Sequence, residues 1–531
     1  MVPLSAAQRS IWFAQQLTPG TPFTIAQYID VSGDLDVSVL SAAGRRVARE
    51  FGTTMVRLVP AADPADAPVQ LIDDSLHADT THLDFRGHMD PEAVARAWMD
   101  AEFRRPLDMF TDRLIKSATL RIADGRYFWY TRVHHILLDG YGAAAFTERV
   151  AEVYTALASG TDVAPSRAGT LTDLYEDDLK YQSSSRFERD REHWVERVAD
   201  LPAPIRLGGA ATGPRSRTVG DCLDPDLQRD VTAFCTDNEV TVAAVVTAAA
   251  ALYIARMSGH DDVVLSLPVS ARTNALLRRS GGMVSNVVPI RTTIDAHTTV
   301  AGFVARVTHE LSGALRHQRF RGEDMRPGQS RGSSAEPGGT RGFFGPAINI
   351  MMFRSAIGLG ELVGSGYVLS TGPIDDLSFL AYTGGGELRV DLEVNATAYS
   401  IAEQEAHHRR FLTVLARLVR SAPHARVRGL DVVAPQDRTW TVPARGPEAT
   451  TARPLPEILR RVADAHPAAT ALVSGDISLR YDELAQRVRR LARVLIAQGV
   501  GPGVGVAVLL PRGTGSVTST LAVLLAGGVF V

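Results

Sequence analysis

Hydrophobic and polar positions repeat along this chain with two different periods. Runs of β-branched and aromatic residues bounded by turn residues predict strands. Segments with an apolar face at helical spacing, or with a cap residue at one end and glycine at the other, predict helices. The predicted strands are 25–31, 114–122, 127–133, 263–268, 283–291, 347–353, 367–370, 387–394, 471–473 and 504–510. The predicted helices are 6–16, 37–51, 93–104, 142–158, 186–198, 240–257, 300–317, 401–419, 458–465, 481–498 and 518–526. Their alternation indicates an α/β protein.

The 531 residues are too many for one hydrophobic core, since a domain takes about 150 residues. We expect a first α/β lobe at 1–175, a second at 176–434, a linker at 435–456 and the start of a further domain at 457–531. Between the first two lobes, residues 161–215 are polar and hold only one predicted helix. The chain stops inside a predicted strand, so we expect that the sequence ends within a domain.

Residues 325–342 contain five glycines and two prolines with almost no apolar side chains. Such a segment buries too little apolar surface to fold by itself, which predicts a loop.

Composition narrows the class of protein. The chain is 45% hydrophobic and 22% charged, with a net charge of −3, so nothing favours nucleic acid or an anionic membrane as a partner. Cys222 and Cys235 form no CxxC pair and no metal-ligand cluster, which predicts no metal site and fits a reducing cytoplasm. The N-terminus has no secretory signal. The apolar stretch 240–255 is shorter than the ~20 residues of a membrane span, so we interpret it as a buried helix.

The segment His134-His135-Ile136-Leu137-Leu138-Asp139-Gly140 carries the clearest candidate chemistry. It follows an aromatic strand, and neighbouring strand side chains point to opposite faces, so one imidazole can reach a cleft while the other packs. An imidazole titrates near neutrality and suits proton transfer. Asp139 and Gly140 are interpreted as a turn that ends the strand. The alternative is a buried, hydrogen-bonded histidine pair without a catalytic role.

Several segments in order resemble one family, the condensation domains of nonribosomal peptide synthetases followed by the first part of an adenylation domain. The matching segments are Ser5-x-Ala7-Gln8-x-x-Ile11-Trp12, His134-His135-x-x-x-Asp139-Gly140, Gly282-x-x-x-Asn286-x-x-Pro289-x-Arg291, Arg316-His317-Gln318-Arg319-Phe320, Leu479 to Leu484 and Leu524 to Val531. The resemblance covers essentially the whole chain. The family usually has an arginine where this sequence has Met55, so Arg57 or another base would substitute, or the lobe would be braced differently.

Three segments resemble in particular the condensation domains of catecholate siderophore synthetases, which take an aryl acid from a separate carrier protein. They are Phe128-Trp129-Tyr130, Phe344-Gly345-Pro346-Ala347-Ile348-Asn349 and Thr371-Gly372-Pro373-Ile374-Asp375-Asp376-Leu377. The alternative is that they mark only a broader group of condensation domains that begin a subunit.

The resemblance implies two chloramphenicol-acetyltransferase-like lobes in a V-shaped pseudo-dimer, plus a partial α/β adenylation subdomain. It assigns His135 to the attacking amine and the Gly140 backbone N–H to the thioester or its oxyanion. His134 would pack, and Asp139 would pair with Arg291 across the lobes. Asn349, Tyr141 and Ser285 would line the substrate tunnel.

The resemblance also implies amide formation between a donor thioester and an aminoacyl acceptor, both carried on the 4'-phosphopantetheine of carrier proteins. The donor carrier, of the aryl type in the closer resemblance, would act in trans, and the acceptor carrier domain would lie downstream. No cofactor would bind directly, and the truncated adenylation part would be inactive. The alternatives are an epimerisation domain, or a non-catalytic domain of the same fold that recruits carriers.

Overall fold

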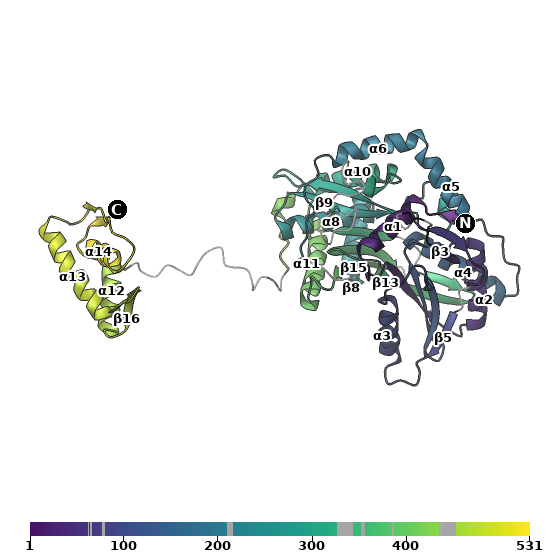
Figure 1. The fold of residues 1–531 in the computed structure, drawn as a ribbon, viewed down its shortest axis with the longest axis horizontal. Helices are drawn as coiled ribbons and strands as arrows, with labels where there is room; N and C mark the ends of the chain where they lie inside the picture. Colours follow the sequence, from purple (N-terminus) through teal and green to yellow (C-terminus); the bar gives the residue numbers. More distant parts are fainter. Residues whose placement is uncertain are drawn as a thin grey trace. The chain divides into compact units, whose positions relative to one another are not determined.

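The computed structural model describes residues 1–61, 63, 66–76, 80–209, 216–325, 344–351, 356–384, 387–434, 437 and 453–531. The chain divides into two compact units, Met1–Arg438 and Thr439–Val531, and each is described by itself (Figure 1). The predicted loop 325–342 lies outside the described residues except for Met325. Most of the predicted linker 435–456 lies outside them as well.

The first lobe is built on a six-stranded sheet of order β12-β13-β2-β7-β6-β5. Its strands are β2 (Thr24–Ser32), β5 (Thr80–Asp84), β6 (Ile115–Ala123), β7 (Arg126–His134), β12 (Ala356–Leu359) and β13 (Leu362–Thr371). The strands β12 and β13 come from a part of the sequence that is predicted to belong to the second lobe. The predicted boundary at 175/176 therefore misses a crossover, in which β13 pairs antiparallel with β2 and completes the first sheet.

Helices cover both faces of this sheet because its strands carry apolar side chains on both sides. On one face, Ile29 and Trp129 pack with α2 (Val37–Phe51) and α4 (Gly140–Ala158). On the other face, Tyr28 and Tyr130 pack with α3 (Pro91–Phe103). The lobe also contains α1 (Ala6–Leu17) and a three-stranded sheet of β1 (Val2–Pro3), β3 (Val56–Val59) and β4 (Val69–Ile72).

The second lobe has a six-stranded sheet of order β10-β9-β11-β14-β15-β8. Its strands are β8 (Ser216–Cys222), β9 (Asp262–Val269), β10 (Asn286–Thr293), β11 (Ala347–Met351), β14 (Leu377–Gly384) and β15 (Glu387–Asn395). Its helices are α7 (Pro225–Asp237), α8 (Val242–Ser258), α9 (Ala275–Arg279), α10 (Val300–Arg316) and α11 (Ile401–Val419), with short 3-10 turns at Gly322–Asp324 and Val427–Gly429.

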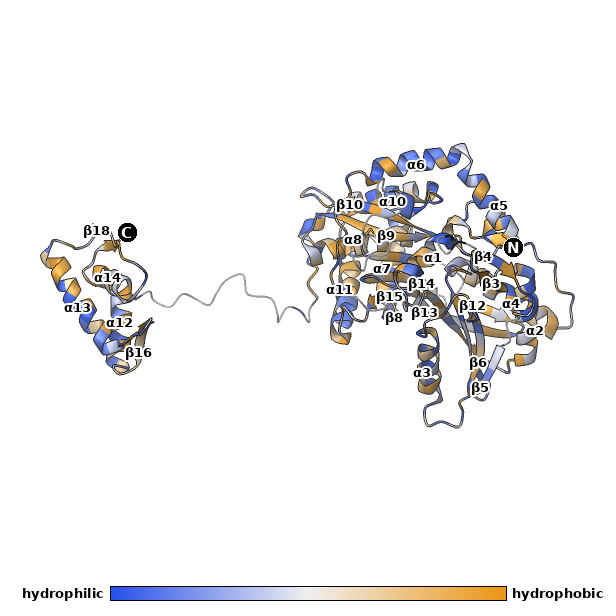
Figure 2. Cartoon of the chain, viewed as in Figure 1, coloured by the Kyte–Doolittle hydropathy of each residue, from blue (hydrophilic) through white to orange (hydrophobic). Residues whose placement is uncertain are grey.

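Helix α8 lies in the middle of the second lobe's core. Every residue from 244 to 255 is buried, and Figure 2 shows the helix in the hydrophobic colour. Among the described residues, no single helix is long and apolar enough to cross a membrane. Helices α7 and α8, bent by 110° relative to each other, together have the length and apolar composition of a membrane span.

Two helices, α5 (Leu171–Gln182) and α6 (Ser185–Val198), bridge the lobes, where the sequence predicted one. Helix α5 buries only Leu171, Leu174 and Tyr181, so its hydrophobic pattern is weak. The missed signal was local: Thr170 and Asp173 form a capping box at its start.

The second unit contains α12 (Leu455–Ala465), β16 (Thr470–Ser474), β17 (Ile477–Arg480), α13 (Tyr481–Ala497), β18 (Gly505–Val506), α14 (Thr514–Leu525) and β19 (Val529–Phe530). The predicted strand 504–510 is shorter than expected: its strand residues are Gly505 and Val506, which pair with β19. The core of this unit is formed by α13 and α14, around Val488 and Ala522.

The two lobes of the first unit touch at the start of α4, where Gly142 lies against Gly282. A Cβ atom on Gly142 would lie 2.9 Å from the carbonyl oxygen of Gly282 and 3.2 Å from Nη2 of Arg272. The first of these distances is too short for a carbon atom, and the atom it meets is backbone, which cannot rotate away. Glycine at position 142 therefore allows this close approach of the lobes.

We predict that Gly142→Ala destabilises the first unit by about 1–3 kcal/mol, because overpacking at the lobe contact exceeds the helix preference for alanine. Urea unfolding followed by tryptophan fluorescence measures the change. Gly140→Ala is the control, since a Cβ at Gly140 meets no atom within 4 Å. Equal stability of the two variants would contradict the steric argument.

Candidate active site

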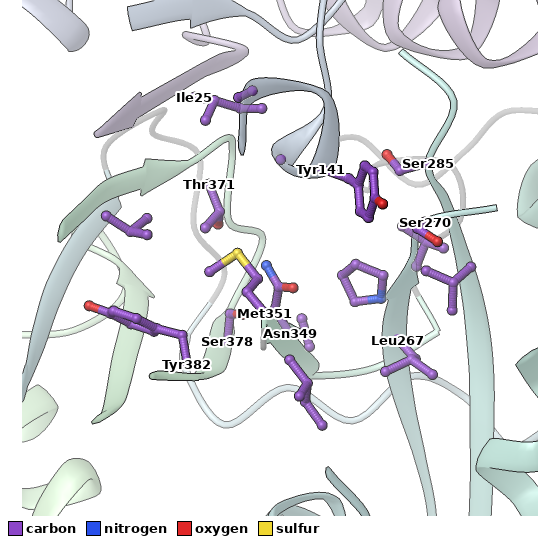
Figure 3. Close-up of a pocket in the computed structure, with 18 of the residues that line it drawn as sticks. Ile25, Tyr141, Leu267, Ser270, Ser285, Asn349, Met351, Thr371, Ser378 and Tyr382 are labelled. Atoms are coloured by element: carbon purple, nitrogen blue, oxygen red, sulfur yellow. The ribbon is translucent and has the colours of Figure 1, made fainter. Parts of the chain in front are cut away.

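A cavity of about 840 Å³ lies between the two lobes and contains most of the predicted site residues. The first lobe contributes Ile25, His135 and Gly140, and the second contributes Leu267 and Met351, among others. Figure 3 shows labelled side chains from both lobes around it, with Tyr141 and Ser285 on one side and Thr371, Met351 and Asn349 on another. A pocket of this size is in the range that holds small molecules.

His135 follows the end of β7 and lines the cavity, half-buried. Its backbone N–H donates to the carbonyl of Phe23 at 2.7 Å, which fixes the chain at the edge of β2. The ring atom Nδ1 has no hydrogen-bond partner among the described residues. Burial lowers the pKa of His135, although Asp139 and the backbone of Thr371 act in the opposite direction. The imidazole is therefore neutral near pH 7 and can accept a proton or a hydrogen bond.

His134 points away from the cavity and is 1% exposed. Its Nδ1 accepts a hydrogen bond from the backbone N–H of Ile136 at 3.1 Å, and its Nε2 lies 3.3 Å from the amide oxygen of Gln15. These partners require a neutral ring protonated on Nε2. Burial, together with the charges of His135 and Arg132, lowers the pKa of His134 to about 3. The structure thus gives His134 a packing environment.

Asp139 is completely buried and is the N-cap of α4, not part of a turn as the sequence suggested. Its Oδ1 accepts from the N–H of Gly142 at 2.7 Å. Its Oδ2 accepts from Nη1 of Arg272 at 2.7 Å and from the N–H groups of Val284 and Ser285 at 2.9 and 2.7 Å. With these four hydrogen bonds the buried carboxylate joins the lobes, and it is not among the residues that line the cavity.

The predicted pairing of Asp139 with Arg291 is wrong. Arg291, on β10, pairs with Asp262 and with Asp200, both at 2.8 Å. The partner of Asp139 is Arg272, whose side chain is fully buried and also donates to the carbonyl of Gly282 at 3.1 Å. The sequence signal for Arg272 is an arginine three residues after the end of the apolar strand β9.

Gly140 begins α4 and lines the cavity together with Tyr141. The first N–H groups of a helix have no partner within the helix, and the helix dipole makes this end positive. The start of α4 therefore offers N–H groups and a favourable field to an oxyanion in the cavity. A Cβ on Gly140 would meet open space, so the structure shows no steric need for glycine here.

The three predicted tunnel residues all line the cavity. The guanidinium of Arg272 lies 4.8 Å from the centre of the Tyr141 ring, which holds the ring in place. Ser285 donates its backbone N–H to Asp139, and Asn349 projects from β11.

Met55 stands where the family usually has an arginine. Met55 is 2% exposed and packs in the core, while Arg57 pairs with Asp73 near the surface at 2.9 Å. A largely buried ion pair of Glu50 and Arg149, 2.8 Å apart, joins α2 to α4 instead.

The sequence did not reveal the contact on the other side of His135. Gly372 has φ +113°, and a Cβ there would lie 3.1 Å from Cδ2 of His135, so glycine leaves room for the ring. The neighbouring Thr371, which lines the cavity at the end of β13, donates its hydroxyl to Oε2 of Glu393 at 2.7 Å. Glu393 lies on β15, so this bond ties the crossover strand to the second sheet.

Glu393 is completely buried, and its Oε1 has no partner among the described residues. Burial raises the pKa of Glu393 to about 7, against the opposing effect of the hydrogen bonds from Thr371. Among the described residues, no group of three or more His, Cys, Asp or Glu side chains could hold a metal ion.

We predict that Glu393 makes the protein less stable as the pH rises. In the unfolded chain the carboxyl ionises near its ordinary pKa of 4.5, whereas in the folded protein it stays protonated to about 7. Its contribution to stability is thus present below pH 4.5 and is lost between 4.5 and 7, a change of about 3 kcal/mol at most. Glu393→Gln removes this titration and keeps an acceptor for Thr371. Urea unfolding at pH 5 and pH 8 should show a smaller loss for the variant, and parallel curves would contradict the assignment.

Comparison with known proteins agrees with this geometry. Residues 1–439 match the family described as "Condensation domain", and residues 459–531 match "AMP-binding enzyme". The chain is 31% identical over 548 residues to a dimodular nonribosomal peptide synthase of Bacillus subtilis and 34% identical over 537 residues to an isonitrile lipopeptide synthase of Streptomyces coeruleorubidus. It is 27% identical over 536 residues to enterobactin synthase component F of Escherichia coli.

These alignments cover 98–99% of this chain but only 22%, 35% and 40% of the three relatives, so the chain spans less than half of their length.

Solved structures show the same fold. A variant of the starter condensation domain of rhizomide synthetase, in complex with C8-CoA, superimposes with a TM-score of 0.74 at 32% identity, covering 81% of this chain and 97% of that one. The first condensation domain of the calcium-dependent antibiotic synthetase gives a TM-score of 0.72 at 31% identity, covering 82% and 99%. With its two chloramphenicol-acetyltransferase-like lobes and its histidine motif at their junction, the chain belongs to the condensation domain family of nonribosomal peptide synthetases, followed by part of an AMP-binding domain.

Proposed function

We propose that this protein forms an amide bond between a carrier-bound acyl or aryl thioester and the α-amine of a carrier-bound aminoacyl acceptor. The observation that carries the proposal is the position of His135, whose ring lines the interlobe cavity next to the first turn of α4 and whose Nδ1 has no hydrogen-bond partner among the described residues. The acceptor nitrogen attacks the thioester carbonyl carbon, the C–S bond breaks, and the donor phosphopantetheine leaves as a thiol that takes up the proton lost by the amine.

In this reaction His135 accepts the proton of the amine or orients its lone pair by a hydrogen bond. The N–H of Gly140 stabilises the developing oxyanion. Asp139 takes no part in proton transfer because its four hydrogen bonds are structural. A thioester is already activated, so most of the acceleration comes from holding two tethered reactants together in the cavity.

For the donor we propose an aryl acid on a separate carrier protein, as part of siderophore synthesis. Support comes from the three segments that resemble catecholate siderophore synthetases and from the likeness to enterobactin synthase component F. The acceptor would come from a downstream carrier domain. We place the reaction in the cytoplasm, where the free thiols of Cys222 and Cys235 stay reduced. The adenylation part, residues 457–531, would be inactive by itself, since only two of its family's motifs lie in this sequence.

We predict that His135→Ala lowers the rate of amide formation by about 100-fold or more, without unfolding the protein, because the amine loses the imidazole that accepts its proton or orients it. Donor-loaded and aminoacyl-loaded carriers are mixed with the protein, and product on the acceptor carrier is followed by intact mass. The control is His260→Ala, which removes an exposed histidine outside the cavity. An unchanged rate for His135→Ala would overturn the assignment.

The same assay tests the donor. We predict that carriers loaded with an aryl acid give product at least about tenfold faster than carriers loaded with an α-amino acid, since a pocket shaped for one acyl group discriminates at this level. A fatty acyl carrier belongs in the panel because one structural relative was solved with C8-CoA. Preference for the fatty acyl or aminoacyl donor would replace the aryl proposal and leave amide formation intact.

A further inference from the structure

The residue before Arg272 has an unusual backbone conformation. Ala271 has φ +53°, a left-handed value that residues with a Cβ atom rarely adopt, and Glu239 is the other such residue in the described part of the chain. Ala271 is 4% exposed and follows the end of β9 by two residues. An outlier of this kind persists where the surrounding structure enforces it, and such outliers gather at functional sites.

The left-handed turn determines where Arg272 points. The chain leaves β9 at Val269, turns at Ala271, and sends the Arg272 side chain into the lobe contact. There Arg272 reaches Oδ2 of Asp139 at 2.7 Å and the carbonyl of Gly282 at 3.1 Å. If Ala271 relaxed to an ordinary negative φ, the direction of the following side chain would change. The buried carboxylate of Asp139 would then lose its only charged partner among the described residues.

Gln318 supplies the side-chain hydrogen bond to the backbone N–H of Ala271, and the hydroxyl of Ser270 accepts from the next N–H, that of Arg272, at 3.4 Å. The backbone N–H of Ala271 donates to Oε1 of Gln318 at 2.8 Å, and Nε2 of Gln318 donates to the carbonyl of Leu315 at 2.8 Å. Both ends of the Gln318 amide are thus engaged, which fixes its orientation.

The backbone of Gln318 is fixed as well. Its carbonyl accepts from Nδ2 of Asn286 at 3.0 Å, and Nδ2 also donates to the carbonyl of Phe320 at 2.6 Å. Oδ1 of Asn286, which is 2% exposed, accepts from the N–H of Gly322 at 3.1 Å. Two segments that the sequence analysis singled out separately, around Asn286 and around Gln318, therefore form one support.

We propose that Gln318 is a positioning residue for the condensation reaction. By accepting a hydrogen bond from the N–H of Ala271, Gln318 holds the left-handed turn that directs Arg272 toward Asp139. Through Asp139 this contact fixes the first turn of α4 beside His135. This inference rests on the proposed function for its activity measurement. It can also be measured without an activity assay, as the rate of hydrogen–deuterium exchange in the backbone of residues 139–143.

The test uses three variants of the full chain. Gln318→Met keeps the volume of the side chain and removes the acceptor. Ala271→Gly removes the steric penalty of the left-handed conformation, because glycine adopts positive φ freely. The double variant combines the two. The matched control is Gln228→Met. Gln228 lies on α7, in another part of the lobe, and its Oε1 accepts a hydrogen bond from the backbone N–H of Leu388 at 2.9 Å.

We expect Gln318→Met to lower kcat for amide formation by at least about fivefold with little change in KM, because the loss lies in the geometry of the site and not in carrier binding. Hydrogen–deuterium exchange should become faster in the peptide that contains residues 139–143. In the double variant both effects should be reversed by at least half, while Ala271→Gly and Gln228→Met behave like the parent protein.

Four results would overturn the proposal: no effect of Gln318→Met, an equal effect of Gln228→Met, a double variant no better than Gln318→Met, or a loss confined to KM. If Gln318→Met alone does not fold, the rescue by Ala271→Gly is measured as the yield of folded protein. A double variant that is equally unfolded would then overturn the proposal. If the parent protein makes no amide, the proposed function fails, and hydrogen–deuterium exchange still decides the role of Gln318.

Discussion

The buried ion pair of Asp139 and Arg272 is the interaction on which the rest of the site depends. Removing two charges from water costs several kcal/mol each, so such a pair is tolerated only where hydrogen bonds satisfy both partners. Here the carboxylate receives four hydrogen bonds, from both lobes, and the guanidinium also binds the carbonyl of Gly282. Losing either residue would leave a charge without a partner in the interior, which makes the relative position of the lobes specific.

This pair explains how a histidine from one lobe is oriented by the other. Asp139 caps α4, so the second lobe fixes the first turn of that helix through Arg272 and the N–H groups of Val284 and Ser285. On the opposite side, Gly372 leaves room for the His135 ring, and the adjacent Thr371 is tied to Glu393 in the second sheet. His135 is thus held from two directions, yet its imidazole lines the cavity.

Such an arrangement suits a reaction between two activated, tethered substrates. The thioester carbonyl needs little further polarisation by the protein. What matters more than a strong base is the exact placement of the amine and the thioester carbonyl relative to the N–H groups of α4. The support includes Gln318, which is not among the cavity-lining residues, and Asn286, which lines the cavity and binds the backbone of Gln318.

The sequence by itself determined the features that depend on neighbouring residues. Strand and helix periods, the cap of α1 at Ser5 and the histidine motif at the end of β7 are all local signals. Only the tertiary structure decided that Arg272 and not Arg291 pairs with Asp139, that β13 completes the first sheet, and that Glu393 anchors Thr371. Asp139 and Arg272 are separated by 133 positions, and their contact depends on how two lobes pack and on one left-handed residue. Spacing along the chain carries no information about either, because ion pairs across a lobe contact are selected by geometry in the folded protein.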